Sequence, residues 1–219
     1  MTDEYRRRLG RHEGAEEPCA REALEEGGSM DFFSPFGPLI ARLRAPDALV
    51  EHLNHYADSR VAAQERLDHF SVPESVFAAG GGQSLSSQTA RWIARYMGLA
   101  DDREVRQVRF ENFWMVRHFA DTFSPVHFHS GDLSGVLYLC VPDSIADEAH
   151  EERKSYISAR RAGYITFFIG GKQRFSKSLI SFKPRVGDFY IFPGWLLHAV
   201  EPFRGEGERR SLSFNAFVD

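Results

Sequence analysis

The sequence predicts a mainly β protein with helices toward its N-terminal side, arranged as a jelly roll. Apolar residues alternate with polar ones from about residue 105 onward, which is the period of strands that bury one face. Gly, Pro and Asp separate these runs at short intervals, as in sandwiches and barrels. Residues 30–104 instead carry apolar side chains at helical spacing over two stretches.

The length of 219 residues and a hydrophobic content of 42% predict one domain with a substantial core. The first 29 residues differ from the rest, because they hold five basic and eight acidic residues and no Phe, Val or Ile. Such a segment buries too little apolar surface to offset the entropy of ordering. We therefore expect a flexible charged tail over residues 1–29 and a single domain over 30–219, with a helical front (30–104) and a jelly-roll core (105–219).

Charge and cysteine content narrow the class of protein further. The net charge of −4 argues against bulk nucleic-acid binding, and no apolar run is long enough to cross a bilayer. The N-terminal sequence has basic residues but no following apolar block, so we expect no secretory signal. Two cysteines are too few for a disulfide framework, which favours a reducing, cytoplasmic location.

The expected elements follow from the local patterns. A short strand over 38–43 precedes a helix that starts at Pro46 and runs toward His69, and a second helix begins near Ser86 and stops at Gly98. Residues 143–161 are polar and charged, and we expect a long loop there. Eight strands are expected at 105–118, 126–129, 134–141, 163–169, 178–183, 189–192, 198–202 and 211–217.

Three histidines form a candidate metal site. His127 and His129 are two residues apart on a predicted strand, so both imidazoles point to one face, while Phe128 points the other way into packing. His198 follows 69 residues later and can reach the same pocket from a facing strand. A His-x-His pair alone is more often a polar pair on a half-exposed strand. Imidazole suits iron, zinc, copper and nickel alike, so the residues alone do not name the metal.

The strand after His198 supports a ligand-binding pocket, because one of its faces is polar throughout. Arg209, Ser211, Ser213 and Asn215 alternate there with mostly apolar residues. Arg209 and Ser211 can bind a carboxylate through hydrogen bonds from a guanidinium group and a hydroxyl group. A salt bridge at the rim is the alternative role for Arg209.

The runs PVHFHSGDLSGVLYL, GDFYIFPGWLLHAVEP and RRSLSFN resemble the iron(II)/2-oxoglutarate-dependent oxygenases, most closely a bacterial and phage subfamily. The resemblance covers residues 110–217 well and implies a double-stranded β-helix, with His127 and His198 as iron ligands. It also places Arg209 and Ser211 where this superfamily binds 2-oxoglutarate.

One position departs from the wider superfamily, which has Asp or Glu two residues after the first histidine, where this chain has His129. Three histidines without a carboxylate resemble the metal set of a cupin, and a neutral third ligand leaves the centre one unit more positive. Asp132 is the alternative to His129, although it has the opposite strand parity. We favour His129.

Further residues are assigned around this site. Tyr138 is a candidate 2-oxoglutarate contact, and Trp114 and Trp195 are candidate walls of the pocket; core packing is the alternative for these three. Asn215 is a candidate partner behind the ligands, and hydrogen bonding at the end of the strand is its alternative. His69 and His118 have no motif context, and we expect them at the surface or in packing.

The resemblance implies an iron(II)- and 2-oxoglutarate-dependent dioxygenase that hydroxylates a small molecule or a peptide and converts 2-oxoglutarate to succinate. The alternatives are a cupin-like three-histidine dioxygenase that does not use 2-oxoglutarate and a non-catalytic metal- or ligand-binding protein. The Arg209–Ser211 pair separates them, because a cupin needs no carboxylate anchor there. Open sheet edges also allow a homodimer.

Overall fold

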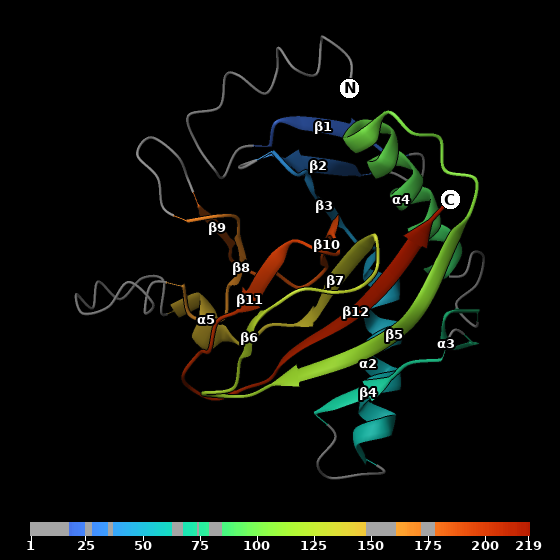
Figure 1. Cartoon of the computed structure of the whole chain (residues 1–219). Coiled ribbons are helices and arrows are strands. Elements are labelled where there is room, and N and C mark those ends of the chain that lie inside the picture. Colours follow the sequence, from blue (N-terminus) through green and yellow to red (C-terminus); the bar gives the residue numbers. More distant parts are fainter. Residues whose placement is uncertain are drawn as a thin grey trace.

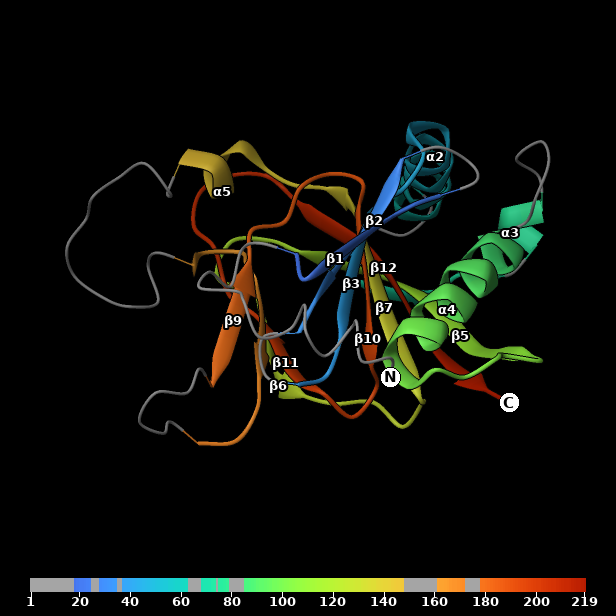
Figure 2. The same ribbon diagram turned by 90° about the horizontal axis from the view of Figure 1, so that it is seen from above.

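Two β-sheets that pack face to face form the body of the molecule (Figures 1 and 2). The computed structural model describes residues 18–24, 28–34, 37–62, 68–73, 75–78, 85–147, 161–171 and 178–219. In order across the larger sheet lie β1 (Ala20–Ala23), β2 (Ser29–Phe33), β3 (Ile40–Arg44), β10 (Asp188–Pro193), β7 (Leu133–Cys140), β12 (Arg209–Val218), β5 (Val108–His118) and β4 (His69–Ser71). The smaller sheet contains β6 (Ser124–His127), β11 (Leu197–Val200), β8 (Ile165–Phe168) and β9 (Leu179–Phe182).

The last eight strands form a double-stranded β-helix, which confirms the predicted jelly roll. Along the chain from β5 to β12, the strands pass back and forth between the two sheets. Each of the eight strands lies within a few residues of its predicted place. The two-residue period was sufficient here because each strand buries one face against the core or against the opposite sheet.

Helices cover the outer face of the larger sheet, so the molecule has three layers (Figure 2). These helices are α2 (Asp47–Ala62) and α4 (Leu85–Asp101). The short helix α3 (Ser75–Ala78) lies beside α4, and the short helix α5 (Asp143–Asp147) lies at the opposite end of the molecule. Trp92 of α4 packs edge-to-face on Phe189 of β10, with ring centroids 5.4 Å apart. A second apolar layer, which includes Phe167 and Tyr190, fills the space between the sheets. No helix among the described residues is long and apolar enough to cross a membrane.

The front of the chain contains more strand than the sequence predicts. Ala20–Ala23, expected in the tail, pair with β2, and the helix expected to run toward His69 ends at Ala62, because His69 begins the edge strand β4. Strand β1 is held by backbone hydrogen bonds and by the Arg21–Asp31 ion pair (2.6 Å), and of its four residues Ala20 packs against the core. A search for apolar periodicity therefore misses it. Residues 1–17 lie outside the described residues.

The expected loop over 143–161 begins differently, because its first five residues form α5. Residues 148–160 lie outside the described residues.

An ion cluster ties the start of β12 to its neighbours. Glu208 accepts two hydrogen bonds from Arg117 of β5, both of 2.8 Å, and one of 2.6 Å from Arg210 of β12. Arg210 also pairs with Asp58 of α2 at 2.8 Å. Burial alone would raise the pKa of Glu208, but the two guanidinium groups hold it below its ordinary value. The cluster thus fixes the end of β12 from which Arg209 projects.

We expect Glu208→Gln to lower the free energy of unfolding by about 1–3 kcal/mol, because two mostly buried guanidinium groups lose their shared carboxylate. Urea unfolding at neutral pH measures the change. Glu206→Gln, at an exposed neighbouring position, is the matched control and should leave stability unchanged. Equal stability of the two variants would contradict a structural role for the cluster.

Candidate metal and dicarboxylate site

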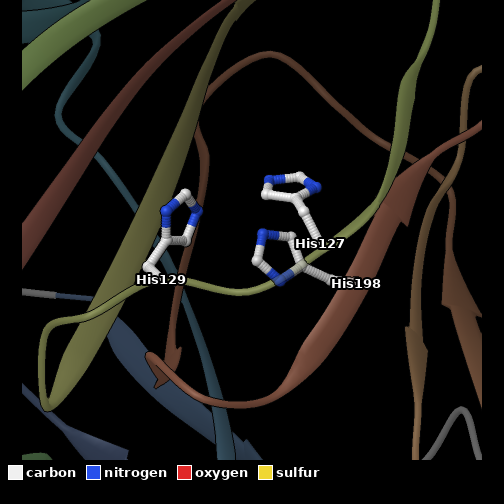
Figure 3. A group of neighbouring side chains, drawn as sticks. All are labelled: His127, His129 and His198. Carbon is white, nitrogen blue, oxygen red and sulfur yellow. The ribbon is translucent and has the colours of Figure 1, made fainter.

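Three histidines meet between the two sheets (Figure 3). His127 ends β6 and lies directly opposite His198 of β11 in the antiparallel register, with ring centroids 4.3 Å apart. His129 lies two residues beyond β6, and its ring is 5.0 Å from that of His127 and 5.1 Å from that of His198. One ring nitrogen from each histidine lies within 4.8 Å of the others, a spacing that suits a shared metal ion.

Backbone carbonyls set the orientation of two of these rings. Nδ1 of His127 lies 2.7 Å from the Pro125 carbonyl oxygen, and Nδ1 of His198 lies 2.8 Å from that of Leu196. A nitrogen that contacts a carbonyl oxygen in this way must carry the proton and donate it. The other nitrogen, Nε2, therefore keeps its lone pair available for a metal in both residues.

Two of these histidines, His129 and His198, are neutral at physiological pH, as metal binding requires. Burial lowers the pKa of His198 to about 3, and burial together with His127 lowers that of His129 to about 4. Aromatic rings of Phe192 and Phe167 lie 4.9 and 6.1 Å from the His198 ring and exclude water on that side.

His129 reaches the site from a loop rather than from a strand, which corrects the predicted extension of β6 to residue 129. Its N–H donates to the Gly194 carbonyl (2.8 Å), and the Gly194 N–H donates to the Asp132 carbonyl (2.9 Å). A Cβ on Gly194 would lie 2.0 Å from the Gly131 oxygen, so only glycine allows this approach. Phe128, expected in packing, is 65% exposed.

The structure does not bring Asp132 to the histidines. Its Oδ2 accepts a hydrogen bond of 3.0 Å from the Val218 N–H, which directs the carboxylate to the end of β12. The candidate ligands that the geometry brings together are therefore His127, His129 and His198.

A cavity of about 360 Å³ extends from the histidines into the space between the sheets. Among the described residues, its lining contains no carboxylate and one permanent positive charge, that of Arg209. The lining consists of His69, Trp114, Val116, His118, Ser124, Pro125, His127, His129, Ser134, Gly135, Val136, Tyr138, Ile165, Phe192, His198, Val200, Arg209, Ser211 and Ser213.

Two hydrogen-bond donors in this cavity are unpaired. Arg209 is 1% exposed, and its Nη1 donates to the carbonyls of Gly163 (2.8 Å) and Glu201 (3.2 Å), whereas its Nη2 has no partner among the described residues. The buried hydroxyl of Tyr138 likewise has none there. Ser211 lies opposite Tyr138 in the register of β12 and β7. Unpaired buried donors are rare and costly, so this group points to a ligand rich in acceptor atoms.

Both donors keep their protons at neutral pH. Burial lowers the pKa of Arg209 only to about 10, so its guanidinium stays charged, and burial raises the pKa of Tyr138 to about 12. A carboxylate is the group that accepts from a guanidinium and a phenol together.

The other residues predicted for the site lie in different places relative to the cavity. Trp114 lines the cavity, with its ring 5.7 Å from that of His129, whereas Trp195 is 56% exposed and lies outside the lining. Asn215 is buried behind the site, where its Oδ1 accepts from the Ser134 hydroxyl (2.8 Å) and its Nδ2 lies 3.5 Å from Glu111 Oε2.

Two cavity residues, His69 and His118, carry no motif in the sequence. His118 is 8% exposed, lies opposite Arg209 in the register of β5 and β12, and has Nε2 3.2 Å from the Ser124 hydroxyl. Strand parity was the available signal for His118, because it shares its face of β5 with Trp114 and Val116.

One family model matches the part of the chain that contains the candidate site. The model described as "Putative 2OG-Fe(II) oxygenase" matches residues 112–215, a segment that contains the three histidines, Tyr138 and Arg209. This segment, a little under half of the chain, is similar to the 2OG-Fe(II) oxygenases. This confirms the predicted family and class of enzyme, while a search of curated proteins finds no match to this oxygenase.

Solved structures agree with this oxygenase in fold. HygX from Streptomyces hygroscopicus with iron bound has a TM-score of 0.51 and 14% identity, and the match covers 82% of both chains. The viral collagen prolyl hydroxylase of Paramecium Bursaria Chlorella virus-1, in its 2OG complex, has a TM-score of 0.50 and 13% identity over 81% of this chain and 94% of that one. Both confirm the double-stranded β-helix.

We expect Gly194→Ala to displace the His129 loop, because a methyl group cannot occupy a position 2.0 Å from a backbone oxygen. Stability should fall by about 1–3 kcal/mol, and metal affinity should fall with it. Gly98→Ala, in open space on α4, is the control and should be neutral or stabilising. Thermal unfolding and metal titration measure both effects, and unaltered metal affinity in Gly194→Ala would contradict the proposed loop contact.

The metal-free oxygenase should lose stability as the pH falls from about 6.5 toward 4. The pKa values of His118 and His129 are about 4 and that of His198 about 3, whereas an unfolded histidine has a pKa of about 6.5. Between these pH values the histidines are protonated in the unfolded chain but not in the folded one. The free energy of unfolding is therefore highest above about pH 6.5 and falls as the pH drops through this range. Urea midpoints across this range test the effect, and a flat profile would contradict it.

Proposed function

We propose that this oxygenase is an iron(II)- and 2-oxoglutarate-dependent dioxygenase that hydroxylates a small molecule or a peptide. The observation that carries the proposal is the position of two unpaired buried donors, Arg209 Nη2 and Tyr138 OH, in the same cavity as three convergent histidines. Neither feature alone selects this chemistry. Together they offer one site for a metal and another for the distant carboxylate of a chelating dicarboxylate.

The histidines fit a divalent first-row metal. Three neutral imidazoles on one side of the ion leave the opposite coordination positions facing the cavity. When bound, iron(II) and 2-oxoglutarate supply the oxidative chemistry that couples decarboxylation of 2-oxoglutarate to hydroxylation. His127, His129 and His198 would hold the metal, and the aromatic side chains around His198 keep bulk water away from it.

Arg209, Tyr138 and Ser211 fit the carboxylate that lies far from the metal. The Nη1 hydrogen bonds to Gly163 and Glu201 hold the guanidinium still, so that Nη2 is already oriented when the ligand arrives. Ser211 lies across the strand pair from Tyr138 and adds a hydroxyl. The ligand thus meets fixed donors and little water.

Charge supports a dianionic ligand. Three neutral histidines leave a divalent ion with its full charge of +2, and Arg209 adds +1 in a cavity without a carboxylate among its described lining residues. A dicarboxylate offsets two of these three charges. A cupin-like dioxygenase that does not use 2-oxoglutarate has no need of the buried Arg209–Tyr138 pair, so that alternative is disfavoured.

Anaerobic addition of iron(II) and then 2-oxoglutarate to the purified protein tests the proposal. We expect a visible metal-to-ligand charge-transfer band and, in air, formation of succinate. Absence of both the band and succinate would overturn the proposed function.

We expect Arg209→Ala to weaken 2-oxoglutarate binding by about 10–100-fold, which corresponds to one lost charge-assisted hydrogen-bond partner, and to leave iron affinity unchanged. Titration monitored by the visible band measures the first effect, and metal analysis measures the second. Arg204→Ala, at an exposed position, is the control. Equal loss of iron and 2-oxoglutarate would indicate that Arg209 supports the fold and does not anchor the ligand.

A cytoplasmic location is part of the proposal, supported by Cys19 and Cys140, which are both free. The homodimer stays a prediction.

A further inference from the structure

A β-bulge in β5 brings a carboxylate to the side of the histidines. In the pairing of β5 with β12, Asn215 lies opposite Asn112 and Ala216 opposite Phe110, which leaves Glu111 without a partner. Regular alternation would place Glu111 on the face of Phe113, in the apolar core beneath the helices. The extra residue releases Glu111 from that face, because a bulge reorients the side chain it carries.

A buried amide holds Glu111 on the cavity side of the sheet. Nδ2 of Asn215 lies 3.5 Å from Glu111 Oε2, and Oδ1 of the same amide accepts a hydrogen bond of 2.8 Å from the Ser134 hydroxyl. Ser134 is 1% and Asn215 7% exposed, so the hydrogen bond between them is buried, whereas Glu111 is exposed. Asn215 and Ser134 therefore support the carboxylate from behind.

The loop that carries His129 crosses the larger sheet at this bulge. A Cβ on Gly131 would lie 2.9 Å from the carbonyl oxygen of Ala216, the residue next to Asn215. The His129 ring lies 5.7 Å from that of Trp114, three residues after Glu111 on the same strand. The negative charge of Glu111 also acts to raise the pKa of His129, against the larger lowering effects of burial and of His127. These contacts place Glu111 and the His129 loop at the same part of the larger sheet, beside Asn215, Ala216 and Trp114.

His129 differs from the other two histidines in one respect. His127 and His198 each donate from Nδ1 to the carbonyl two residues earlier, whereas the His129 ring has no hydrogen bond to any described residue. Histidines that bind metals nearly always donate their second ring N–H to an acceptor, which fixes the ring and makes the ligand nitrogen more basic. Glu111 is the acceptor placed to do this.

We propose that Glu111 is a positioning residue that accepts the N–H of the His129 ring nitrogen that faces away from the metal. This inference rests on the proposed function, because it assigns a role in the same metal site. Glu111 is exposed, so its side chain can turn toward His129 while Asn215 keeps it near the sheet. Glu111 thus supplies a negative charge to the three-histidine site without contacting the metal itself, because His129 lies between the carboxylate and the metal.

Glu111→Ala and Glu111→Gln test the proposal, with Glu51→Ala at an exposed position of α2 as the matched control. The probe is iron(II) alone, titrated anaerobically against a competing chelator. We expect Glu111→Ala to weaken iron binding by about 10–100-fold, and Glu111→Gln to weaken it less, because an amide oxygen still accepts the hydrogen bond.

A second measurement, ¹⁵N NMR of the histidine rings in the metal-free protein, separates positioning from a general loss of structure. We expect one His129 tautomer in the wild-type protein and a mixture in Glu111→Ala, with His127 and His198 unchanged. Wild-type iron affinity in Glu111→Ala would overturn the proposal, as would an unchanged His129 tautomer despite weaker binding. If the wild-type protein itself bound no iron, the proposed function would fail instead.

Discussion

The site depends on the register in which β12 lies between β5 and β7. Alternate side chains of this strand enter two different environments: Leu212 and Phe214 pack beneath the helices, whereas Arg209 and Ser211 face the cavity. A shift by one residue would bury apolar groups in the cavity and charged ones in the core. The Glu208 ion cluster at one end of β12 and the Asp132 contact at the other hold the strand at this register.

The three clustered histidines depend on this strand only indirectly, through turns. His127 and His198 are fixed by β-pairing, a local and strong constraint, whereas His129 is fixed by two loops that meet at Gly194. The loop beyond His129 in turn lies against the end of β12 at Ala216. The loop that carries His129 is thus attached near the end of β12 opposite Arg209.

Much of this architecture could be predicted from the sequence. The eight core strands follow a two-residue period, and His127, His198 and Arg209 lie within recognisable motifs. Buried Phe side chains fill both layers around the larger sheet, and Phe167 and Phe192 lie beside His198.

The missed features share a physical cause. Strand β1 is held by ion pairs and backbone hydrogen bonds that leave no apolar pattern, and a bulge such as that at Glu111 breaks the alternation on which strand assignment relies. His118 has no sequence motif; strand parity gives its face of β5, but its place opposite Arg209 depends on the pairing of β5 with β12. Local periodicity reports burial, whereas these positions depend on how distant segments pair.

The unpaired donors of Arg209 and Tyr138 affect the stability and the cellular abundance of the protein as well as its chemistry. Burying a guanidinium nitrogen and a phenol without acceptors lowers the stability of the empty fold, and a dicarboxylate that satisfies them returns that stability in proportion to its concentration. Proteolysis acts on the unfolded fraction, so a modest change in stability alters abundance several-fold. The amount of this oxygenase in a cell would then follow the supply of its own co-substrate.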